Sequence, residues 1–294
     1  MKAAYLQNPP ENSPENPIGV FDSGVGGLSV LREIRRELPG ENLLYVADSG
    51  HAPYGDKPGQ TIEARSIAIG EFLLSRHAKA IVVACNTATG AAIKTLRARF
   101  SVPIVAMEPA VKPAAAHTKS GVIGVLATSG TLSSSNFAKL HERFGAEVEI
   151  LVQACPGLVE QVEAGDLSGG NTRALIEKYL VPLLAQEADT IVLGCTHYPF
   201  LAPLIREIAG PAVAIIDPAP AVARELRRRL ASTHLLSGKH RGGTELFWTS
   251  AKPDTARPVI SQLWGMDIEV QSLPNSASGS LGNAGWISVA HPPF

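Results

Sequence analysis

The chain has 294 residues, of which 45% are hydrophobic, 18% charged and 5% aromatic, so it can bury a substantial core and is not disordered as a whole. Its 26 basic and 27 acidic side chains leave a formal net charge of -1 at pH 7, which gives no sign of a polyanion-binding protein or an acidic tail. A chain of this length is typical of about two domains.

The first residues, MKAAYLQNPPENSPENP, turn polar before the apolar core of a signal peptide could form. No uninterrupted apolar run approaches the ~18 to 20 residues that span a bilayer. We therefore expect a cytoplasmic protein that does not enter a membrane. We also expect residues 1–16 to be a disordered lead and residues 273–294 to be a flexible tail.

Short runs rich in aliphatic and β-branched residues alternate with amphipathic segments along the chain. The runs predict buried strands at 18–21, 43–46, 80–84, 102–106, 122–126, 148–152, 190–194 and 213–216, with a further strand in GTELFWTS at 243–250. The amphipathic segments predict helices at 28–38, 62–76, 136–144, 158–164, 171–186, 203–209 and 221–230. Alternating strands and helices predict an α/β fold with mainly parallel sheets.

The sequence also repeats itself at an offset of roughly a domain length. Three pairs of strings line up in order: 18–24 with 123–130, AIVVACNT at 80–87 with TIVLGCT at 190–196, and PIVAMEPA at 103–110 with VAIIDPA at 213–219. The second pair places Cys85 on Cys195, and the third places Glu108 near Asp217. We infer two related, pseudo-symmetric α/β units, at 17–112 and 113–219, with a linker around 110–120.

Cys85 and Cys195 each follow an apolar strand, at the end where open α/β sheets place their ligand sites. Either cysteine alone is more simply read as a small buried core residue. Two equivalent cysteines in facing units predict instead that both look into one cleft. The third, Cys155, leaves an odd number without short spacings, so no disulfide framework is expected, and no metal site either, because only Cys195 and His197 lie close together.

Two thiols on opposite sides of one cleft suit inversion at a carbon centre. One thiol removes a proton from one face while the other delivers a proton to the opposite face. A thiol can serve as the base because nearby positive charge or a helix N-terminus can lower its ordinary pKa of ~8.5. No cofactor is expected, so preorganised donors, for example at Thr87 and Thr196, would stabilise the carbanion-like transition state.

Other segments offer further candidates. The glycine-rich string DSGVGG at 22–27 does not complete a dinucleotide-binding fingerprint, because Ser29 stands where that fingerprint needs glycine. Its glycines fit an anion cradle and a tight turn equally well. Asp22 and Ser23 are candidate substrate contacts. The composition of the loop at 48–55 does not decide a function for it, and a lone glutamate such as Glu163 is usually a solvated side chain. The basic run 227–229 is expected to be a solvated helix face rather than a nucleic-acid contact.

Five strings over about residues 17–272 resemble the glutamate racemases of the aspartate/glutamate racemase family. They are GVFDSGVGGLSVL from Gly19, ADSGHAPYG from Ala47, VACNTA from Val83, ACPGLVEQVEAG from Ala154 and GCTHYPFL from Gly194. The resemblance implies cofactor-independent interconversion of L- and D-glutamate in a cleft between two domains, supplying D-glutamate for peptidoglycan. It further implies a first domain of 17–112 plus 220–272, a second of 113–219, and a homodimer.

The resemblance also implies residue roles. Cys85 corresponds to the proton carrier for D-glutamate and Cys195 to that for L-glutamate, with Asp22 assisting the former, and His197 and Glu163 the latter. Glu160 stands where the family pattern has proline, so the stretch that aligns Glu163 with the family's glutamate departs from that pattern. The implied substrate contacts are Asp22, Ser23, Tyr54, Gly55, Asn86, Thr87, Thr196 and His197.

Three other functions remain open on the residues alone. In a cysteine-nucleophile amidohydrolase, His197 would activate Cys195 and Cys85 would be a bystander. A racemase of aspartate or another amino acid would use the same two thiols, and a binding module would close on an amino acid without turnover. A hydrolase predicts a thioester and no exchange at the α-carbon, and a binding module predicts neither.

Overall fold

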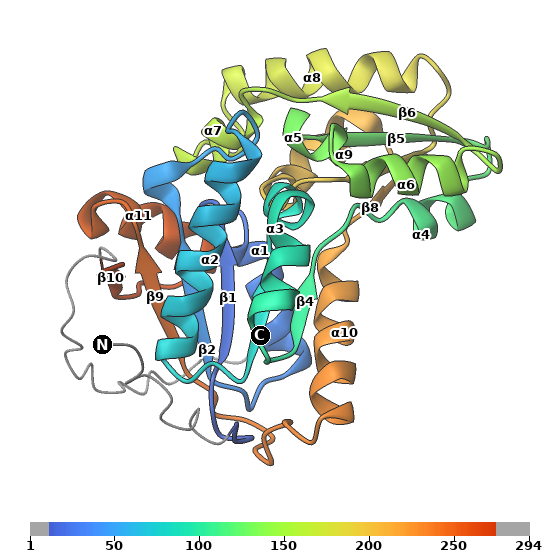
Figure 1. The fold of residues 1–294 in the computed structure, drawn as a ribbon. Helices are drawn as coiled ribbons and strands as arrows, with labels where there is room; N and C mark the ends of the chain where they lie inside the picture. Colours follow the sequence, from blue (N-terminus) through green and yellow to red (C-terminus); the bar gives the residue numbers. More distant parts are fainter. Residues whose placement is uncertain (1–11, 275–294) are drawn as a thin grey trace.

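The computed structural model describes residues 12–274. These form two parallel sheets (Figure 1), one of six strands in the order β10-β9-β2-β1-β3-β4 and one of four in the order β6-β5-β7-β8. The predicted α/β fold class with mainly parallel sheets is confirmed. The strands are β1 Ile18–Asp22, β2 Leu43–Ala47, β3 Ala80–Val83, β4 Ile104–Ala106, β5 Val122–Ala127, β6 Glu149–Ala154, β7 Thr190–Leu193, β8 Ala214–Ile216, β9 Glu245–Thr249 and β10 Val270–Ser272.

Helices connect the strands and cover the sheets. They are α1 Leu28–Glu37, α2 Gly59–Ser75, α3 Asn86–Arg99, α4 Val111–His117, α5 Ser129–Leu132, α6 Ser135–Phe144, α7 Leu158–Glu163, α8 Gly170–Leu184, α9 Ala202–Ala209, α10 Ala219–Ser232 and α11 Pro253–Trp264, with the 3-10 turns η1 Ser49–His51 and η2 Tyr198–Leu201. No helix in the described range is long and apolar enough to cross a membrane.

The two sheets repeat one topology, as the sequence repeat predicted. In the first, β1 pairs with β2 and β3, and β3 pairs with β4. In the second, β5 pairs with β6 and β7, and β7 pairs with β8. The segment after α10 adds β9 beside β2 and β10 beside β9, so it extends the first sheet. Exact domain boundaries remain a prediction.

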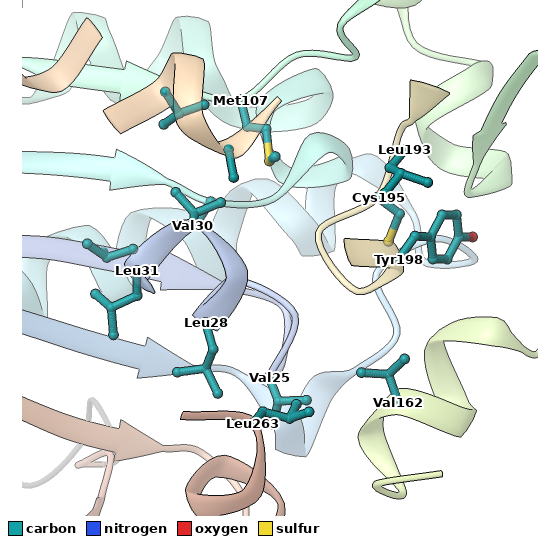
Figure 2. Close-up of a cluster of buried hydrophobic side chains, with 14 of the residues drawn as sticks. Val25, Leu28, Val30, Leu31, Met107, Val162, Leu193, Cys195, Tyr198 and Leu263 are labelled. Atoms are coloured by element: carbon teal, nitrogen blue, oxygen red, sulfur yellow. The ribbon is translucent and has the colours of Figure 1, made fainter. Parts of the chain in front are cut away.

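The core follows from the alternation of side chains along the buried strands. On one face of the first sheet, Val20 and Tyr45 pack in a cluster with Leu31 of α1 and Leu226 of α10, whereas on the other face Phe21 packs with α2 and α3 residues. The first cluster continues into the second sheet's half. Figure 2 shows this continuity, with Leu28 and Val25 on one side and Val162, Cys195 and Tyr198 on the other. This cluster therefore spans both halves, and each half also has a hydrophobic cluster of its own.

Some elements differ from those that the sequence predicted. The expected linker at 110–120 is largely helical, because Val111 and Ala114 of α4 bury their side chains against Ile123 and Val125 of β5. Helices α3 and α11 and strand β10 were not predicted. Of the predicted lead, residues 1–11 lie outside the described range, and residues 12–16 form a turn that hydrogen-bonds to Lys79. Of the predicted tail, residues 275–294 lie outside it.

Candidate active site

The carboxyl ends of equivalent strands bring the predicted residues together. Asp22 ends β1, Cys85 follows β3 as the N-cap of α3, and Cys195 follows β7. Thr128 lies directly after β5. Because the two sheets carry the same strand order, the ends of β3 and β7 are equivalent positions, and the two cysteines face one space from the two halves.

Both cysteines line a single cavity. Its walls consist of Ser23, Pro53, Tyr54, Gly55, Cys85, Asn86, Thr87, Thr128, Thr131, Val159, Cys195, Thr196 and His197. Its free volume is about 10 Å³, room for about one water molecule. An amino acid is larger, so its entry requires the two walls to move apart. The two sulfur atoms open onto the same cavity, as the sequence predicted.

Cys85 is held at the start of α3. Its Sγ accepts a hydrogen bond from the backbone amide of Ala88 at 3.4 Å and lies 3.7 Å from the hydroxyl of Ser23. Burial raises the pKa of the Cys85 thiol well above its ordinary value, and the charge of Asp22 adds to this effect. Both effects favour the neutral thiol form of Cys85.

Cys195 begins a chain of polar contacts that runs through His197 to Glu163. Its Sγ lies 3.6 Å from Nδ1 of His197, and Nε2 of His197 lies 2.7 Å from Oε1 of Glu163. Burial lowers the pKa of His197, but the contacts with Cys195 and Glu163 outweigh burial and hold it well above its ordinary value. The imidazolium form therefore persists beside Cys195, at hydrogen-bonding distance from Glu163.

Glu163 also contacts the first half. Its Oε1 accepts a hydrogen bond from the backbone amide of Val25 at 2.7 Å, and its Oε2 accepts one from the hydroxyl of Ser49 at 3.2 Å. Its side chain is 19% exposed, so it is not the solvated glutamate that the helix position alone favoured. Glu163 does not line the cavity, and it reaches Cys195 only through His197.

Asp22 is completely buried beneath the cavity. Its Oδ2 accepts a hydrogen bond from the backbone amide of Gly27 at 2.9 Å, and the hydroxyl of Thr196 lies 3.5 Å from both carboxylate oxygens. Burial raises the pKa of Asp22, and the charge of His197 opposes this effect. The carboxyl group can therefore exchange a proton with a neighbouring thiol over a pH range closer to neutrality.

The absence of side chains at Gly24 and Gly26 lets Glu163 and His197 of the second half pack against this turn. A Cβ atom on Gly26 would lie 2.3 Å from Nδ1 of His197, and one on Gly24 would lie 1.8 Å from Oε1 of Glu163. Of the two functions considered for the glycine turn, the structure shows a close-packed turn that receives the His197 and Glu163 side chains. The backbone amides of Val25 and Gly27 in this turn donate to the carboxylates of Glu163 and Asp22.

The remaining cavity walls supply hydroxyl and amide groups. The Asn86 side chain is buried, and neither its Oδ1 nor its Nδ2 has a hydrogen-bond partner in the described part of the chain. The Thr87 hydroxyl from α3 lies 2.9 Å from that of Thr128 and 3.2 Å from that of Thr131, both from the second half. Of the first backbone amides of α3, that of Ala88 is bonded to Cys85 Sγ, whereas those of Asn86 and Thr87 precede the hydrogen-bonded part of the helix, which makes this wall suited to a carboxylate.

Four cavity residues were not predicted from the sequence: Pro53, Thr128, Thr131 and Val159. For Thr128 a signal was present, because the repeat aligned the segment after 123–126 with the segment containing Asp22. Among the described residues, no group of three or more His, Cys, Asp or Glu side chains is placed to hold a metal ion. The chemistry of the donors present is that of thiols, carboxyls, an imidazole and hydroxyls.

Comparison with known proteins places this site in a family. A family model described as Asp/Glu/Hydantoin racemase matches residues 18–226. The chain is 59% identical over 260 residues to a glutamate racemase of Methylococcus capsulatus, a match that covers 88% of this chain and 96% of that relative. A glutamate racemase structure from Bacillus anthracis superposes with a TM-score of 0.80 at 33% identity, covering 89% of this chain and 98% of that one.

A second solved structure carries ligands. The Escherichia coli glutamate racemase, in complex with L-glutamate and the activator UDP-MurNAc-Ala, superposes with a TM-score of 0.76 at 32% identity. The match covers 87% of this chain and 97% of that one.

Proposed function

The chain belongs to the Asp/Glu/hydantoin racemase family, and from this premise we propose that it interconverts L- and D-glutamate without a cofactor, using Cys85 and Cys195 as its two proton carriers. The family makes it an amino-acid racemase, and the name of its 59%-identical relative supports glutamate as the substrate. The observation that carries the two-cysteine mechanism is that both thiols line one cavity from equivalent strand ends of two repeated sheets.

The reaction requires two proton transfers. With D-glutamate, the Cys85 thiolate takes the α-proton, which leaves a carbanion-like centre, and the Cys195 thiol gives its proton to the opposite face to form L-glutamate. The sulfur that began as thiolate ends as thiol, and its partner ends as thiolate, so the proton count is conserved. With L-glutamate the two roles are exchanged.

The substrate itself supplies the charge that activates the thiol. Burial keeps Cys85 protonated, whereas a substrate ammonium group placed in the same cavity is a positive charge that lowers a neighbouring thiol pKa. We assign Asp22 as the group that takes the proton from Cys85, and His197, oriented by Glu163, as the group that exchanges a proton with Cys195.

The carboxylate beside the reacting carbon needs hydrogen-bond donors, because it carries the negative charge that develops in the transition state. Asn86 and Thr87 at the start of α3 and Thr196 after β7 line the cavity, and the side-chain amide of Asn86 has no partner among the described residues. Ser23, Tyr54 and Gly55 complete the wall on the side of Cys85. We propose these groups as the substrate contacts.

The role of D-glutamate in the cell is also part of this proposal. We propose that the product supplies peptidoglycan synthesis in the cytoplasm and that the enzyme acts as a homodimer. A strain that lacks this gene is expected to require D-glutamate for growth, and the purified protein is expected to show the mass of a dimer by light scattering. Growth without D-glutamate, or a monomer mass, would contradict the respective statement.

The experiment that tests the mechanism is incubation with each glutamate enantiomer in D₂O. Two separate bases predict that early product carries deuterium at the α-carbon, whereas unconverted substrate keeps its proton. Optical rotation follows inversion, and proton NMR follows exchange. A protein that neither inverts nor exchanges either enantiomer is not a racemase of glutamate, and product that retains the substrate proton points to a single base.

A further inference from the structure

A buried ion pair outside the cavity holds the loop that carries Tyr54 and Gly55. Asp48 follows β2 and its side chain is fully buried. Arg65 of α2 donates from Nε to Oδ2 of Asp48 at 2.9 Å and from Nη2 to Oδ1 at 2.7 Å, two parallel bonds of the kind that fix both planar groups. Burial raises the pKa of Asp48, but the hydrogen bonds from Arg65, Ser250 and Tyr54 together outweigh burial and keep this pKa below its usual value.

The same carboxylate holds the hydroxyl of Tyr54. The Tyr54 Oη donates to Oδ2 of Asp48 at 2.5 Å, and Nδ1 of His51 lies 3.0 Å from Oδ1. Burial and the charge of Asp48 raise the pKa of Tyr54, so the phenol stays protonated. A phenol has one proton to donate. Tyr54 lines the cavity, while its hydroxyl proton is committed to Asp48, which does not line it.

This loop joins both halves of the site. The backbone amide of Asp48 donates to the carbonyl of Asp22 at 3.0 Å, which ties the start of the loop to β1. At its other end Gly55 packs against the second half, where a Cβ atom on Gly55 would lie 3.1 Å from Cβ of Thr128. Neither Asp48 nor Arg65 lines the cavity, yet the wall between these two attachments depends on them.

We propose that Asp48 and Arg65 are positioning residues for substrate binding, because their ion pair fixes the Tyr54 hydroxyl and so sets the cavity wall at 53–55. The inference rests on the proposed racemase function. The two thiols are held by other elements, Cys85 by the start of α3 and Cys195 by its contact with His197. Loss of the ion pair therefore weakens binding in both directions and leaves the proton transfers largely intact.

Steady-state kinetics of Arg65→Met and Tyr54→Phe test this inference. A hydrogen bond to a charged group is worth about ten- to a hundredfold in affinity, so Arg65→Met is expected to raise KM by about that factor for both enantiomers. The value of kcat is expected to change by less than about threefold, since uniform binding is what is lost. Arg65→Lys keeps the charge without the paired bonds and is expected to restore only part of the affinity.

The double variant Arg65→Met with Tyr54→Phe separates positioning from direct contact. If the hydroxyl acts through Asp48, the double variant has the KM of Arg65→Met alone. If the hydroxyl contacts the substrate directly, the two effects multiply, and the proposal is overturned. Tyr54→Phe removes a single oxygen atom, so it provides the result even if Arg65→Met does not fold, and an unchanged KM in both Tyr54→Phe and Arg65→Lys also overturns the proposal.

Arg99→Met is the matched control. Arg99 also pairs with a carboxylate of α2, Glu71, but this pair is half exposed and lies outside the site. Its loss is expected to leave KM and kcat unchanged, and a rise in KM equal to that of Arg65→Met would overturn the proposal. Inactivity of the unaltered protein toward both enantiomers would refute the proposed function instead, which keeps the two failures distinct.

Discussion

The carboxylate of Glu163 accepts a hydrogen bond from the backbone amide of Val25 at 2.7 Å, although the two residues belong to different halves and are 138 positions apart. The same oxygen atom lies 2.7 Å from Nε2 of His197. One side chain therefore joins the imidazole beside Cys195 to the glycine turn that follows β1. The contact between the two halves at this point and the protonation of His197 therefore involve a common group.

Glu163→Gln is expected to lower the pKa of His197, because the substitution removes the negative charge that favours the imidazolium while burial remains. NMR titration of the ring measures this shift directly. The rate of racemisation is expected to fall by roughly ten- to a hundredfold, less than the roughly 10²–10⁴-fold effect of a general acid–base group, because Glu163 acts through His197. Glu160→Gln, an exposed position on the same helix, is the control and should leave both quantities unchanged.

The decrease of the free energy of unfolding at rising pH follows from two of the raised pKa values. Burial raises the pKa of Cys85, and for His197 the contacts with Cys195 and Glu163 outweigh burial. A group whose folded pKa is raised contributes stability that is fully present below its unfolded pKa and is lost as pH rises through its folded pKa. The contribution of His197 to stability is therefore lost above about pH 6.5, and that of Cys85 above about pH 9.

We expect the free energy of unfolding to decrease as pH rises above about 6.5, as measured by urea denaturation in steps between pH 6 and pH 10, where these two groups titrate. Glu163→Gln should flatten the lower part of this decrease, because it removes the cause of the raised His197 pKa. An unfolding free energy that rises with pH across the same window would contradict the assignment of a charged His197.

Much of the architecture was predictable because it follows from apolar runs along the chain and from the internal sequence repeat. Strands such as β1 and β7 are buried along their whole length and mostly apolar, as is typical of parallel strands covered on both faces. The repeat that aligned Cys85 with Cys195 predicted one shared cavity, since equivalent strand ends of paired units face each other. Helix α3 was missed because its N-cap is Cys85, which is not among the residues that usually signal a helix start.

What the sequence could not supply are contacts between distant segments. The glycines at 24 and 26 allowed two interpretations until the structure placed Glu163 and His197 against them. Glu163 itself looked like a surface residue, because nothing near it in the chain indicates Val25 or Ser49 as partners. The Asp48 and Arg65 pair was equally invisible, since 17 residues separate the two side chains.

Removal of either cavity thiol is expected to abolish racemisation. Cys85→Ala and Cys195→Ala should each reduce the rate by roughly 10²–10⁴-fold or more, because each deletes one of the two groups that move a proton. Cys155→Ala is the matched control, since Cys155 is also buried but does not line the cavity, and burial raises its pKa to about 12. Circular dichroism follows the conversion of each enantiomer. Normal turnover by Cys85→Ala or Cys195→Ala would remove that residue from the mechanism.

Asn86 should separate binding from stability. Its buried side-chain amide has no partner among residues 12–274, so Asn86→Ala is expected to lose no hydrogen bond there, and the free energy of unfolding should stay constant or rise. Its affinity for glutamate should fall by about tenfold, because a donor to the substrate is lost. Thr89→Val is the control: Oγ1 of Thr89, also on α3, is likewise buried without a partner in that range, but Thr89 does not line the cavity.

Calorimetric titration with D-glutamate and urea denaturation measure these two quantities for both variants. Thr89→Val is expected to keep the affinity of the unaltered protein. Equal affinity in Asn86→Ala and the unaltered protein would show that the amide does not contact the substrate.

Gly26→Ala is expected to disturb the site through a clash with His197. The added Cβ would lie 2.3 Å from Nδ1 and 2.6 Å from Cε1 of the ring, distances at which the imidazole must move. Overpacking of this kind costs about 1–3 kcal/mol of stability, and displacement of the ring breaks its contact with Cys195. Gly59→Ala is the same chemical change at the start of α2, where, in the part of the chain that the structure describes, no atom beyond the adjoining backbone lies within 4 Å of the added carbon.

Gly59→Ala should leave activity unchanged and stabilise the protein by about 0.4–1 kcal/mol, because alanine restricts the unfolded chain more than glycine does. Thermal unfolding and racemisation rates of the two variants measure the contrast. If Gly26→Ala keeps full activity and melts at the temperature of the unaltered protein, the turn has room for a side chain. In that case close approach of His197 cannot be the reason that glycine stands at position 26.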